Sequence, residues 1–360
     1  MTAPETLDPW VNLLLAQGLG DYDFNECVGR GHFGLVFAAT NRVTSARVAV
    51  KVLGPGAQSA DALDFDNEGR LLQRLNSCDR VISYVDGGTE TITFSSGEFD
   101  LPLPIRYHVL SLASASAEEL VRNPSARDGW DWAERLGVWR GAVKGIHQMH
   151  LNGVAHRDLK SSNVLLMLHG KTVRARLGDL GRSRDLALAP TLPPELYLSG
   201  RGDRSHAPPE FLWLQGGNSA QDFLAADYYG LGSLLVELVT GQPISLLAMG
   251  NFKLVLEQAV RDYNLGIHGD LSALRSRYRT TVAEVVEQMP RSIQRDAQVV
   301  LSNLCDPVPS ERLRSVPFSQ DRRLQNPLEW VIRRADIMIR RIQKDAIEER
   351  RNARRHERSA

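Results

Sequence analysis

The sequence predicts an α+β chain in which a small β-rich lobe precedes a larger helical lobe. Two stretches, residues 22–53 and 81–112, consist of short β-type runs bounded by glycine and turn residues, which is typical of antiparallel strands. Between them, the apolar residues of 61–76 recur at spacings that can form one face of a helix. Helical periodicity dominates the rest of the chain, at residues 131–150, 221–240, 251–263 and 281–304.

The length of 360 residues is enough for one two-lobed unit with an addition at each end. We expect a short helical extension over residues 1–20, because an Asp-Pro pair in it has the sequence of a helix start. The β-rich lobe is predicted to span residues 21–113 and the helical lobe residues 114–317. Residues 318–360 are predicted to form a basic amphipathic helix, since apolar residues recur there every three or four positions.

The composition favours a folded, cytoplasmic protein. Hydrophobic residues make up 42% and charged residues 24% of the chain, and the formal net charge of zero gives no reason to expect binding to nucleic acid or membranes. The three cysteines are far apart and lack the spacing of a metal site or a disulfide framework, which favours a reducing compartment. We expect no membrane span, because the longest apolar candidate, residues 231–239, is interrupted by Glu237. Arginine outnumbers lysine by 37 to six, which we interpret as a sign of a GC-rich, bacterial genome.

Three glycines, Gly29, Gly31 and Gly34, form the pattern Gly-x-Gly-x-x-Gly between two β-type runs. The backbone N–H groups of such a hairpin can close over phosphates, because glycine places no side chain in the way. The pattern alone is weak evidence, since it also occurs in dinucleotide-binding folds and in ordinary glycine-rich hairpins. Here a β-type run that begins at Leu35 follows the glycines, where a dinucleotide-binding fold would have a helix.

Lys51 follows the last of these glycines by seventeen residues, inside an apolar β-type run. A solvated surface explains this position poorly, whereas an ammonium group that faces a cleft and contacts phosphates explains it well. Such a lysine needs a carboxylate to hold it, and Glu68 on the following predicted helix is the candidate. A solvated helix face is the alternative for Glu68 when it is considered alone.

The most specific motif runs from His156 to Asn163, with the sequence H-R-D-L-K-S-S-N, before an apolar β-type run. Its carboxylate, Asp158, could accept a hydrogen bond from an attacking hydroxyl group and orient it. Lys160 could neutralise charge on a transferred phosphoryl group, and the amide oxygen of Asn163 suits a divalent metal. Farther along, Asp179 in an Asp-Leu-Gly triplet supplies a hard oxygen donor of the kind that Mg²⁺ prefers.

Two further motifs complete the series. Glu210 ends an Ala-Pro-Pro-Glu sequence, and Asp227 begins the sequence Asp-Tyr-Tyr-Gly-Leu-Gly. We expect Arg312 to be the buried partner of Glu210. Removing one member of such a buried pair typically costs about 3–5 kcal/mol of stability.

In this order the motifs resemble those of the eukaryotic-type serine/threonine protein kinase superfamily, over roughly residues 22–315. The resemblance implies the two-lobed protein kinase fold. It also implies transfer of the γ-phosphate of ATP, with Mg²⁺, to serine or threonine hydroxyls of protein substrates and of the chain itself. Lys160 resembles the serine/threonine branch, because the tyrosine branch usually has a different residue there.

The resemblance also implies a role for each matched residue. Lys51, paired with Glu68, would hold the phosphates of ATP. Asp158 would be the catalytic base, and Asn163 and Asp179 would bind Mg²⁺. Leu110 would be the gatekeeper, with Ser111 and Ala113 lending backbone groups to adenine. The other residues expected around ATP are Gly29, Gly31, Gly34, Val36 and Ala49.

Substrate docking is the part that the resemblance determines least. Asp203 occupies a place where serine/threonine kinases usually have threonine, and His206 a place where tyrosine is common. Arg157, directly before the catalytic aspartate, resembles kinases whose activation segment is ordered by phosphorylation. We therefore expect autophosphorylation at Thr191 or Ser199, with the charge of Asp203 partly replacing a phosphate.

Two other functions remain as alternatives. A pseudokinase would use the fold only for binding, although such proteins usually lack the lysine, the base or the metal aspartate. A small-molecule phosphotransferase would share the base and the metal ligands but would generally lack the complete glycine loop and the Pro-Glu element. The basic C-terminal helix also has two interpretations: it packs on the helical lobe, or it docks an acidic protein or nucleic acid.

Overall fold

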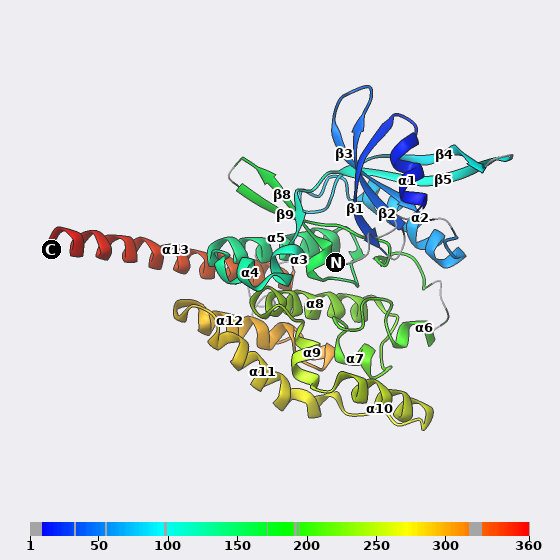
Figure 1. The fold of residues 1–360 in the computed structure, drawn as a ribbon. Coiled ribbons are helices and arrows are strands. Elements are labelled where there is room, and N and C mark those ends of the chain that lie inside the picture. Colours follow the sequence, from blue (N-terminus) through cyan, green and yellow to red (C-terminus); the bar gives the residue numbers. More distant parts are fainter. Residues whose placement is uncertain are drawn as a thin grey trace, which may run out of the picture. The chain divides into compact units, whose positions relative to one another are not determined.

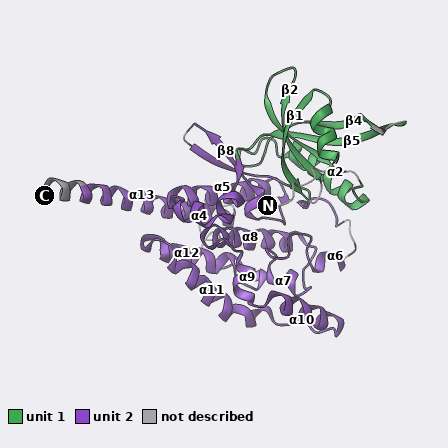
Figure 2. Cartoon of the chain, viewed as in Figure 1, with its two compact units in different colours: residues 1–114, 179–181 green, residues 115–178, 182–360 purple. Residues whose placement is uncertain are grey.

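The structure is a computed structural model with two compact units, which are described separately (Figure 2). Unit 1 comprises Met1–Ser114 and Asp179–Gly181, and unit 2 comprises Ala115–Gly178 and Arg182–Ala360. Unit 1 is built on an antiparallel sheet and unit 2 is mostly helical, so the predicted fold class is confirmed (Figure 1). The residues that the structure describes are 9–31, 34–54, 56–96, 99–170, 172–190, 193, 195–316 and 326–359.

Unit 1 contains a five-stranded sheet in the order β1-β2-β3-β5-β4, in which all neighbouring strands are antiparallel. The central strand β3 is buried from Val48 to Val52, which explains its continuous apolar sequence. The bounds of the elements are α1 Pro9–Gln17, β1 Tyr22–Gly31, β2 Gly34–Asn41, β3 Arg47–Leu53, α2 Ser59–Arg74, β4 Tyr84–Ser96 and β5 Phe99–Ser111.

One apolar core joins the sheet of unit 1 to helix α1. The rings of Phe24 and Phe37 stack with their centroids 4.5 Å apart, and Val11 and Leu14 of α1 belong to the same buried cluster. The N-terminal helix is therefore an integral part of the packing of unit 1. Residues 1–8 of the expected extension lie outside the described residues.

Unit 2 contains most of the helices and three short strand pairs. Strand β8 pairs with β6 and with β9, and β7 pairs with β10. Its strands are β6 Ala115–Ser116, β7 Val154–Ala155, β8 Val164–His169, β9 Thr172–Leu177 and β10 Arg184–Asp185. Its helices are α3 Ala117–Arg122, α4 Pro124–Gly129, α5 Trp132–Leu151, η1 Ser161–Asn163, α6 Glu195–Leu198, α7 Pro209–Leu212, α8 Ala220–Thr240, α9 Ile244–Met249, α10 Phe252–Asn264, η2 Leu271–Leu274, α11 Arg275–Glu287, α12 Arg291–Leu304, η3 Pro309–Glu311 and α13 Pro327–Ser359.

Helix α8 forms the centre of unit 2. It is the one helix among the described residues that is long and apolar enough to cross a membrane, but 89% of its most apolar stretch is buried inside the protein. The indole N–H of Trp139 on α5 donates to the carbonyl of Leu231 on α8 at 2.8 Å. The apolar character of α8 is thus explained by its place in the core.

One helix predicted from the sequence is two helices in the structure. The periodic stretch 281–304 is divided at Pro290: α11 ends at Glu287 and α12 begins at Arg291. Proline has no N–H for the helical hydrogen bond and its ring collides with the preceding turn, so a helix cannot run through it undisturbed.

The first half of the C-terminal helix α13 packs on the other helices of unit 2. The helix begins at Pro327, and residues 318–325 of the expected basic segment lie outside the described residues. The residues at its apolar spacing, Leu328, Val331 and Ala335, are fully buried in the contact of α13 with α5 and α12. On α12, the buried carboxylate of Asp296 pairs with Arg334 of α13 at 2.6 Å. The second half of α13 extends beyond the other helices of unit 2 (Figure 1).

The expected ion pair between Glu210 and Arg312 is present in unit 2 and is buried. Two parallel hydrogen bonds of 2.7 and 2.6 Å join the guanidinium of Arg312 to the carboxylate of Glu210. The carbonyl oxygens of Ala225 and Asp306 accept further hydrogen bonds from Arg312 at 3.0 and 2.9 Å. This arginine therefore connects three segments of unit 2.

We predict that Arg312→Met lowers the free energy of unfolding by about 3–5 kcal/mol, because it leaves the carboxylate of Glu210 buried without its partner. Chemical denaturation followed by circular dichroism measures this loss. Arg314→Met is the matched control, since Arg314 pairs with Glu311 at 2.6 Å but its side chain is 70% exposed, and it should change stability by less than about 0.5 kcal/mol. Equal effects of the two substitutions would contradict the structural role of the buried pair.

Candidate active site

Three charged side chains meet in unit 1. Lys51 on β3 lies with its Nζ 2.6 Å from Oε2 of Glu68 on α2 and 3.0 Å from Oδ1 of Asp179. Lys51 and Glu68 are buried, and their partnership is the one expected from the sequence. Burial disfavours the charged lysine, but the negative charges of Asp179 and Glu68 outweigh it and raise the pKa of Lys51 above its ordinary value. The site therefore holds a permanent, oriented ammonium group.

The glycine loop connects β1 to β2, where Gly31 and Gly34 are cross-strand partners. Gly34 has φ +151°, and a Cβ there would overlap the carbonyl oxygen of Val52 on β3, so this position requires glycine. A Cβ at Gly29 or Gly31 would meet its neighbours at ordinary contact distances, so local packing within unit 1 does not explain these two glycines. Residues 32 and 33 of the loop lie outside the described residues.

The residues expected near adenine lie on adjacent strands of unit 1. Ala49 on β3 is the cross-strand partner of Leu110 on β5, and Val36 on β2 is the partner of Lys51. Ser111 ends β5, with Ala113 two positions beyond it. The sheet thus places Val36, Ala49 and Leu110, which the resemblance assigned to the ATP site, on adjacent strands.

A buried histidine packs against helix α2 beside the lysine pair. His108 on β5 is the cross-strand partner of Lys51, and its ring stacks on Phe65 with centroids 4.1 Å apart. Nε2 of His108 donates to the carbonyl of Phe65 at 2.9 Å, and burial lowers the pKa of His108, so the ring is neutral. The imidazole fits because residue 69 is glycine: a Cβ there would lie within 3.0 Å of three ring atoms. Gly69 directly follows Glu68, so this contact helps to set the position of Glu68.

In unit 2 the loop at residues 156–163, called the catalytic loop after its expected role, is held by a buried carboxylate on α8. Asp227 accepts hydrogen bonds from the backbone N–H groups of His156 and Arg157 at 2.8 and 2.7 Å, and contacts Nε2 of His150 at 2.8 Å. Burial works against its charge, but the contact with His150 and the loop N–H groups outweigh it and hold the pKa of Asp227 below its ordinary range. Arg157 has φ +68°, a left-handed conformation that is uncommon without glycine and that this anchoring maintains.

Hydrogen bonds within the loop fix two more of its side chains. Nδ1 of His156 accepts from the N–H of Asp158 at 3.3 Å, so the proton is on Nε2, which donates to the carbonyl of Gly178 at 3.2 Å. The amide nitrogen of Asn163 donates to the carbonyl of Asp158 at 2.7 Å. The nitrogen end of the amide is thereby engaged, which leaves the oxygen of Asn163 as the candidate metal ligand.

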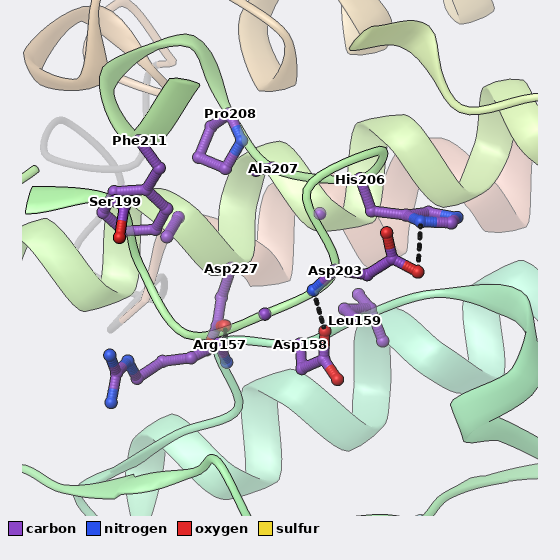
Figure 3. A pocket seen from close by; sticks show the side chains of 13 residues that line it. Arg157, Asp158, Leu159, Ser199, Asp203, His206, Ala207, Pro208, Phe211 and Asp227 are labelled. Atoms are coloured by element: carbon purple, nitrogen blue, oxygen red, sulfur yellow. Dashed lines mark hydrogen bonds and ion pairs between the residues drawn. The ribbon is translucent and has the colours of Figure 1, made fainter. Parts of the chain in front are cut away.

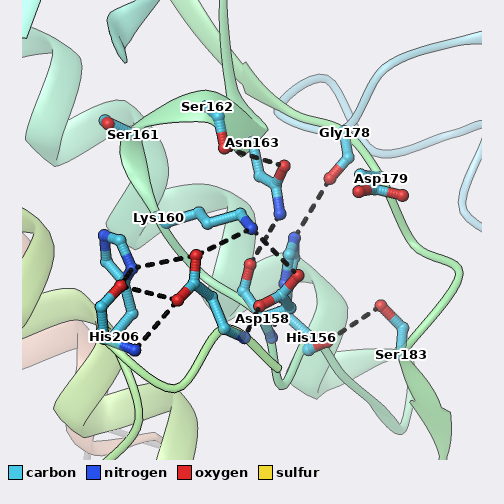
Figure 4. Close-up of polar contacts among 12 residues, drawn as sticks. His156, Asp158, Lys160, Ser161, Ser162, Asn163, Gly178, Asp179, Ser183 and His206 are labelled. Atoms are coloured by element: carbon cyan, nitrogen blue, oxygen red, sulfur yellow. Dashed lines mark hydrogen bonds and ion pairs between the residues drawn. The ribbon is translucent and has the colours of Figure 1, made fainter. Parts of the chain in front are cut away.

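The carboxylate of Asp158 lies within a small network of charges (Figure 4). Its Oδ1 accepts a hydrogen bond from the backbone N–H of Asp203 at 2.9 Å, and its Oδ2 lies 3.7 Å from Nζ of Lys160. The carboxylate of Asp203 lies 3.6 Å from the same Nζ and also contacts His206. Asp203 thus contacts both Asp158 and Lys160, the two residues that a threonine at this position usually contacts.

A shallow pocket that is open to solvent lies beside this carboxylate in unit 2. Figure 3 shows Asp158 and Asp203 on one side of it and Pro208 and Phe211 on another. Arg157 also lines the pocket, and its guanidinium lies 4.5 Å from the ring centroid of Phe223. The combination of an oriented carboxylate with an apolar wall suits an extended peptide that presents a hydroxyl group.

The donor atoms expected for Mg²⁺ fit a hard cation. Asp179 in unit 1 supplies a carboxylate, and Asn163 in unit 2 supplies an amide oxygen. Asp179 has φ +55°, again the uncommon left-handed conformation, at a position that is not glycine. No group of three or more His, Cys, Asp or Glu with metal-binding geometry occurs among the residues that the structure describes.

Sequence analysis missed the roles of three residues that organise this site. Asp227 was recognised as part of a motif, but not as the anchor of the loop. His150 was assigned only to the end of a helix, and Glu237 only to an apolar stretch. Glu237 accepts hydrogen bonds from the backbone N–H and the hydroxyl group of Ser161 at 3.1 and 2.6 Å. A charged residue inside an otherwise apolar, buried helix is the sequence signal that could have identified both acidic residues.

Comparisons with known proteins agree with this geometry. The family model for the protein kinase domain matches residues 22–320. The chain is 30% identical over 224 residues to the serine/threonine-protein kinase fused of Drosophila melanogaster, and 26% identical over 219 residues to cyclin-dependent kinase 9-B of Xenopus laevis. It is also 26% identical over 223 residues to cysteine-rich receptor-like protein kinase 14 of Arabidopsis thaliana.

These three alignments cover between 60 and 62% of this chain. The chain spans 24, 55 and 30% of the respective lengths of these relatives. All three come from animals or a plant, so the expected bacterial origin gains no support from them.

We predict that Gly69→Ala and His108→Ala are coupled. Gly69→Ala alone should destabilise the protein, because the new methyl group overlaps the imidazole of His108, and overpacking typically costs about 1–3 kcal/mol. In the double variant this overlap is gone, so it should be more stable than the sum of the single effects by about 1–3 kcal/mol. Unfolding measured by denaturant gives the coupling energy.

Gly137→Ala on α5 is the control for this cycle, because a Cβ at Gly137 would meet nothing within 4 Å. It should not couple to His108→Ala. Additive effects of Gly69→Ala and His108→Ala would show that the imidazole does not depend on the space at Gly69.

Proposed function

The chain belongs to the protein kinase family, and we propose that it is an active kinase that transfers the γ-phosphate of ATP, with Mg²⁺, to serine or threonine hydroxyls of proteins. The observation that carries the proposal is the contact of the buried Lys51 with the buried Glu68 and with the partly exposed Asp179. Lys51, Glu68 and Asp179 come from three separate segments. A lysine that is buried in this way does not contribute to solubility, so its ammonium group needs another explanation. It is suited to bind phosphates next to a metal ligand.

Each residue of the site would then have a defined task. Lys51 would bind the phosphates, and the loop with Gly29 and Gly31 would cover them with backbone N–H groups. Mg²⁺, held by Asn163 and Asp179, would neutralise phosphate charge. Asp158 would accept the hydrogen bond of the attacking hydroxyl group.

Specificity for serine and threonine is proposed on two grounds. Lys160 is the residue typical of that branch, and it lies 3.7 Å from the carboxylate of Asp158, where it can contact the transferred phosphoryl group. Two of the relatives are named as a serine/threonine kinase and a cyclin-dependent kinase. The pocket beside Asp158, with its apolar wall, supports a peptide rather than a small polar molecule as the acceptor.

We further propose that the chain phosphorylates itself. Burial and the nearby positive charge of Arg201 lower the pKa of Arg157 to about 10, so an added anion there would be favourable. Ser199 lines the same pocket as Arg157. The structure gives the carboxylate of Asp203 other cationic neighbours, Lys160 and His206, so replacement of a phosphate by Asp203 at Arg157 is not part of this proposal.

Location and partners are also proposals. The three cysteines are thiols and not disulfides, in agreement with a reducing compartment such as the cytoplasm. The partners are protein substrates, and we propose neither a membrane nor a nucleic acid. The second half of α13 is the candidate docking surface for an acidic partner, because it is basic and extends beyond the other helices of unit 2.

Asp158→Asn should lower phosphate transfer by about 10²- to 10⁴-fold, because a carboxylate that orients the hydroxyl group becomes an amide. The assay follows labelled phosphate from ATP to a basic protein, with and without Mg²⁺. Lys51→Ala should be similarly inactive while it stays folded. Asp128→Asn, whose side chain is 74% exposed, is the control and should retain activity. If Asp158→Asn transferred phosphate as fast as the wild type, the assignment of Asp158 as the base would be refuted. A wild type that transfers no phosphate would favour a pseudokinase.

Mass spectrometry after incubation with ATP and Mg²⁺ should detect phosphate on Ser199 or on Thr191, which lies outside the described residues. The double variant Thr191→Ala/Ser199→Ala should lose this phosphate and retain part of its activity towards other proteins. The partial loss follows because aromatic rings already pack on Arg157 without a phosphate. Absence of phosphate from both residues in the wild type would rule out this choice of sites.

A further inference from the structure

The segment that ends at His206 lies against the catalytic loop in unit 2 and contains both departures from the usual kinase pattern. Nδ1 of His206 lies 3.7 Å from Oδ2 of Asp203, and its Nε2 lies 3.3 Å from Oε1 of Glu237 on α8. The ring is largely covered, with 15% of its side chain exposed. A histidine therefore lies between two carboxylates that come from different segments.

The hydrogen bonds around the ring indicate its protonation state. The hydroxyl group of Ser205 donates its single proton to Oδ1 of Asp203 at 2.6 Å. Its oxygen lies 3.0 Å from Nδ1 of His206 and can then only accept, so Nδ1 carries a proton. Nε2 lies close enough to the carboxylate of Glu237 for an ion pair, although the two groups do not form a well-aligned hydrogen bond. The geometry thus describes an imidazolium cation.

Electrostatics agree with this geometry. Burial alone would favour the neutral ring, but the carboxylates of Asp203 and Glu237 outweigh it and raise the pKa of His206 to about 9. The partner responds in the opposite sense: the contact with His206 holds the pKa of Asp203 well below its ordinary range. The other charged groups next to this pair are Lys160 and Asp158 of the catalytic loop, on the far side of Asp203.

Both residues whose carboxylates contact His206 also hold the catalytic loop. Glu237 binds the backbone N–H and the hydroxyl group of Ser161, at the start of η1. Asp203 donates its backbone N–H to Oδ1 of Asp158. A Cβ at Gly202, the preceding residue, would lie 2.8 Å from the same oxygen, so the segment lies directly on Asp158. Movement of Asp203 would therefore change the position of the Asp158 carboxylate.

We propose that His206 is a positioning residue, whose imidazolium ties Asp203 to Glu237 and so holds Asp158 and the substrate-docking segment in one arrangement. The role for Asp158 rests on the kinase activity proposed above. The tie itself is a property of the folded chain and can be tested without any activity. The usual tyrosine at this position could contact Glu237 but would bring no positive charge to Asp203.

The first experiment is an NMR titration of the histidine ring nitrogens in the full chain, with His206 assigned from the signal missing in His206→Gln. In the wild type the ring should titrate near pH 9. In Asp203→Asn the ring should titrate at lower pH, because one of the two carboxylates is gone. This variant keeps the hydrogen bond from the backbone N–H of residue 203 to Asp158. A His206 ring that titrates near its ordinary value of about 6.5 in the wild type would overturn the proposal.

The second experiment measures phosphate transfer to a protein substrate. His206→Gln should lower kcat/KM for the protein substrate by about 10- to 100-fold, the range expected for a displaced reacting group, with KM for ATP unchanged. His206→Lys, which keeps a positive charge, should recover part of this loss. Asp203→Asn should lower kcat/KM in the same way as His206→Gln, and it alters a side chain that is 40% exposed. Circular dichroism checks that each variant is folded.

The pH profile adds a readout that a merely structural role would not move. A raised pKa means that the stabilising charge is fully present below about pH 6.5 and is lost as the pH rises through about 9. Wild-type activity should therefore fall as the pH passes 9, and His206→Gln should lack this step. Identical kcat and pH profiles of wild type and His206→Gln would contradict the positioning role. A wild type that transfers no phosphate would refute the kinase proposal, and the titration would still decide whether the tie exists.

Discussion

The part of the catalytic loop that directly precedes Asp158 depends on the buried carboxylate of Asp227. A buried carboxylate is costly unless hydrogen bonds replace its water, and here two backbone N–H groups and His150 do so. Those two N–H groups belong to consecutive residues, His156 and Arg157. Binding both fixes the chain direction just before Asp158 and maintains the left-handed conformation of Arg157. The orientation of the proposed base therefore originates in the core of the helical unit.

The other buried charges follow the same rule, and each connects segments that are distant in sequence. The buried Lys51 lies 128 positions from Asp179, whose carboxylate is partly exposed, and the buried pair of Glu210 and Arg312 spans 102 positions. Such pairs contribute little net stability compared with apolar packing, but breaking one leaves a charge without a partner. Incorrect packing of either unit would leave several charges without their partners. Buried ion pairs thus act here mainly by disfavouring other arrangements of the chain.

The sequence predicted most where the signal is local. Lys51 and Glu68 could be paired because a strand and the next helix are neighbours, and the helix break at Pro290 could have been read from the chemistry of proline. The partner of His206 could not be found in this way. Glu237 lies 31 positions farther along, in a helix whose composition indicates only core, and the contact exists because α8 passes beneath the catalytic loop. Spacing reveals a motif, whereas a role that depends on tertiary packing needs the fold.

Two histidines show how far the surroundings decide the chemistry of one side chain. His108 in unit 1 stacks on an aromatic ring, donates to a single carbonyl group and is neutral, since burial outweighs the other influences and lowers its pKa. His206 in unit 2 is also largely covered, but it lies between two carboxylates and is a cation. The first fills a space left by Gly69, and its contribution changes little at any pH above neutrality. The second carries a charge that its neighbours require, so the arrangement around Asp158 responds to alkaline pH while the lysine cluster of unit 1 does not depend on a histidine charge.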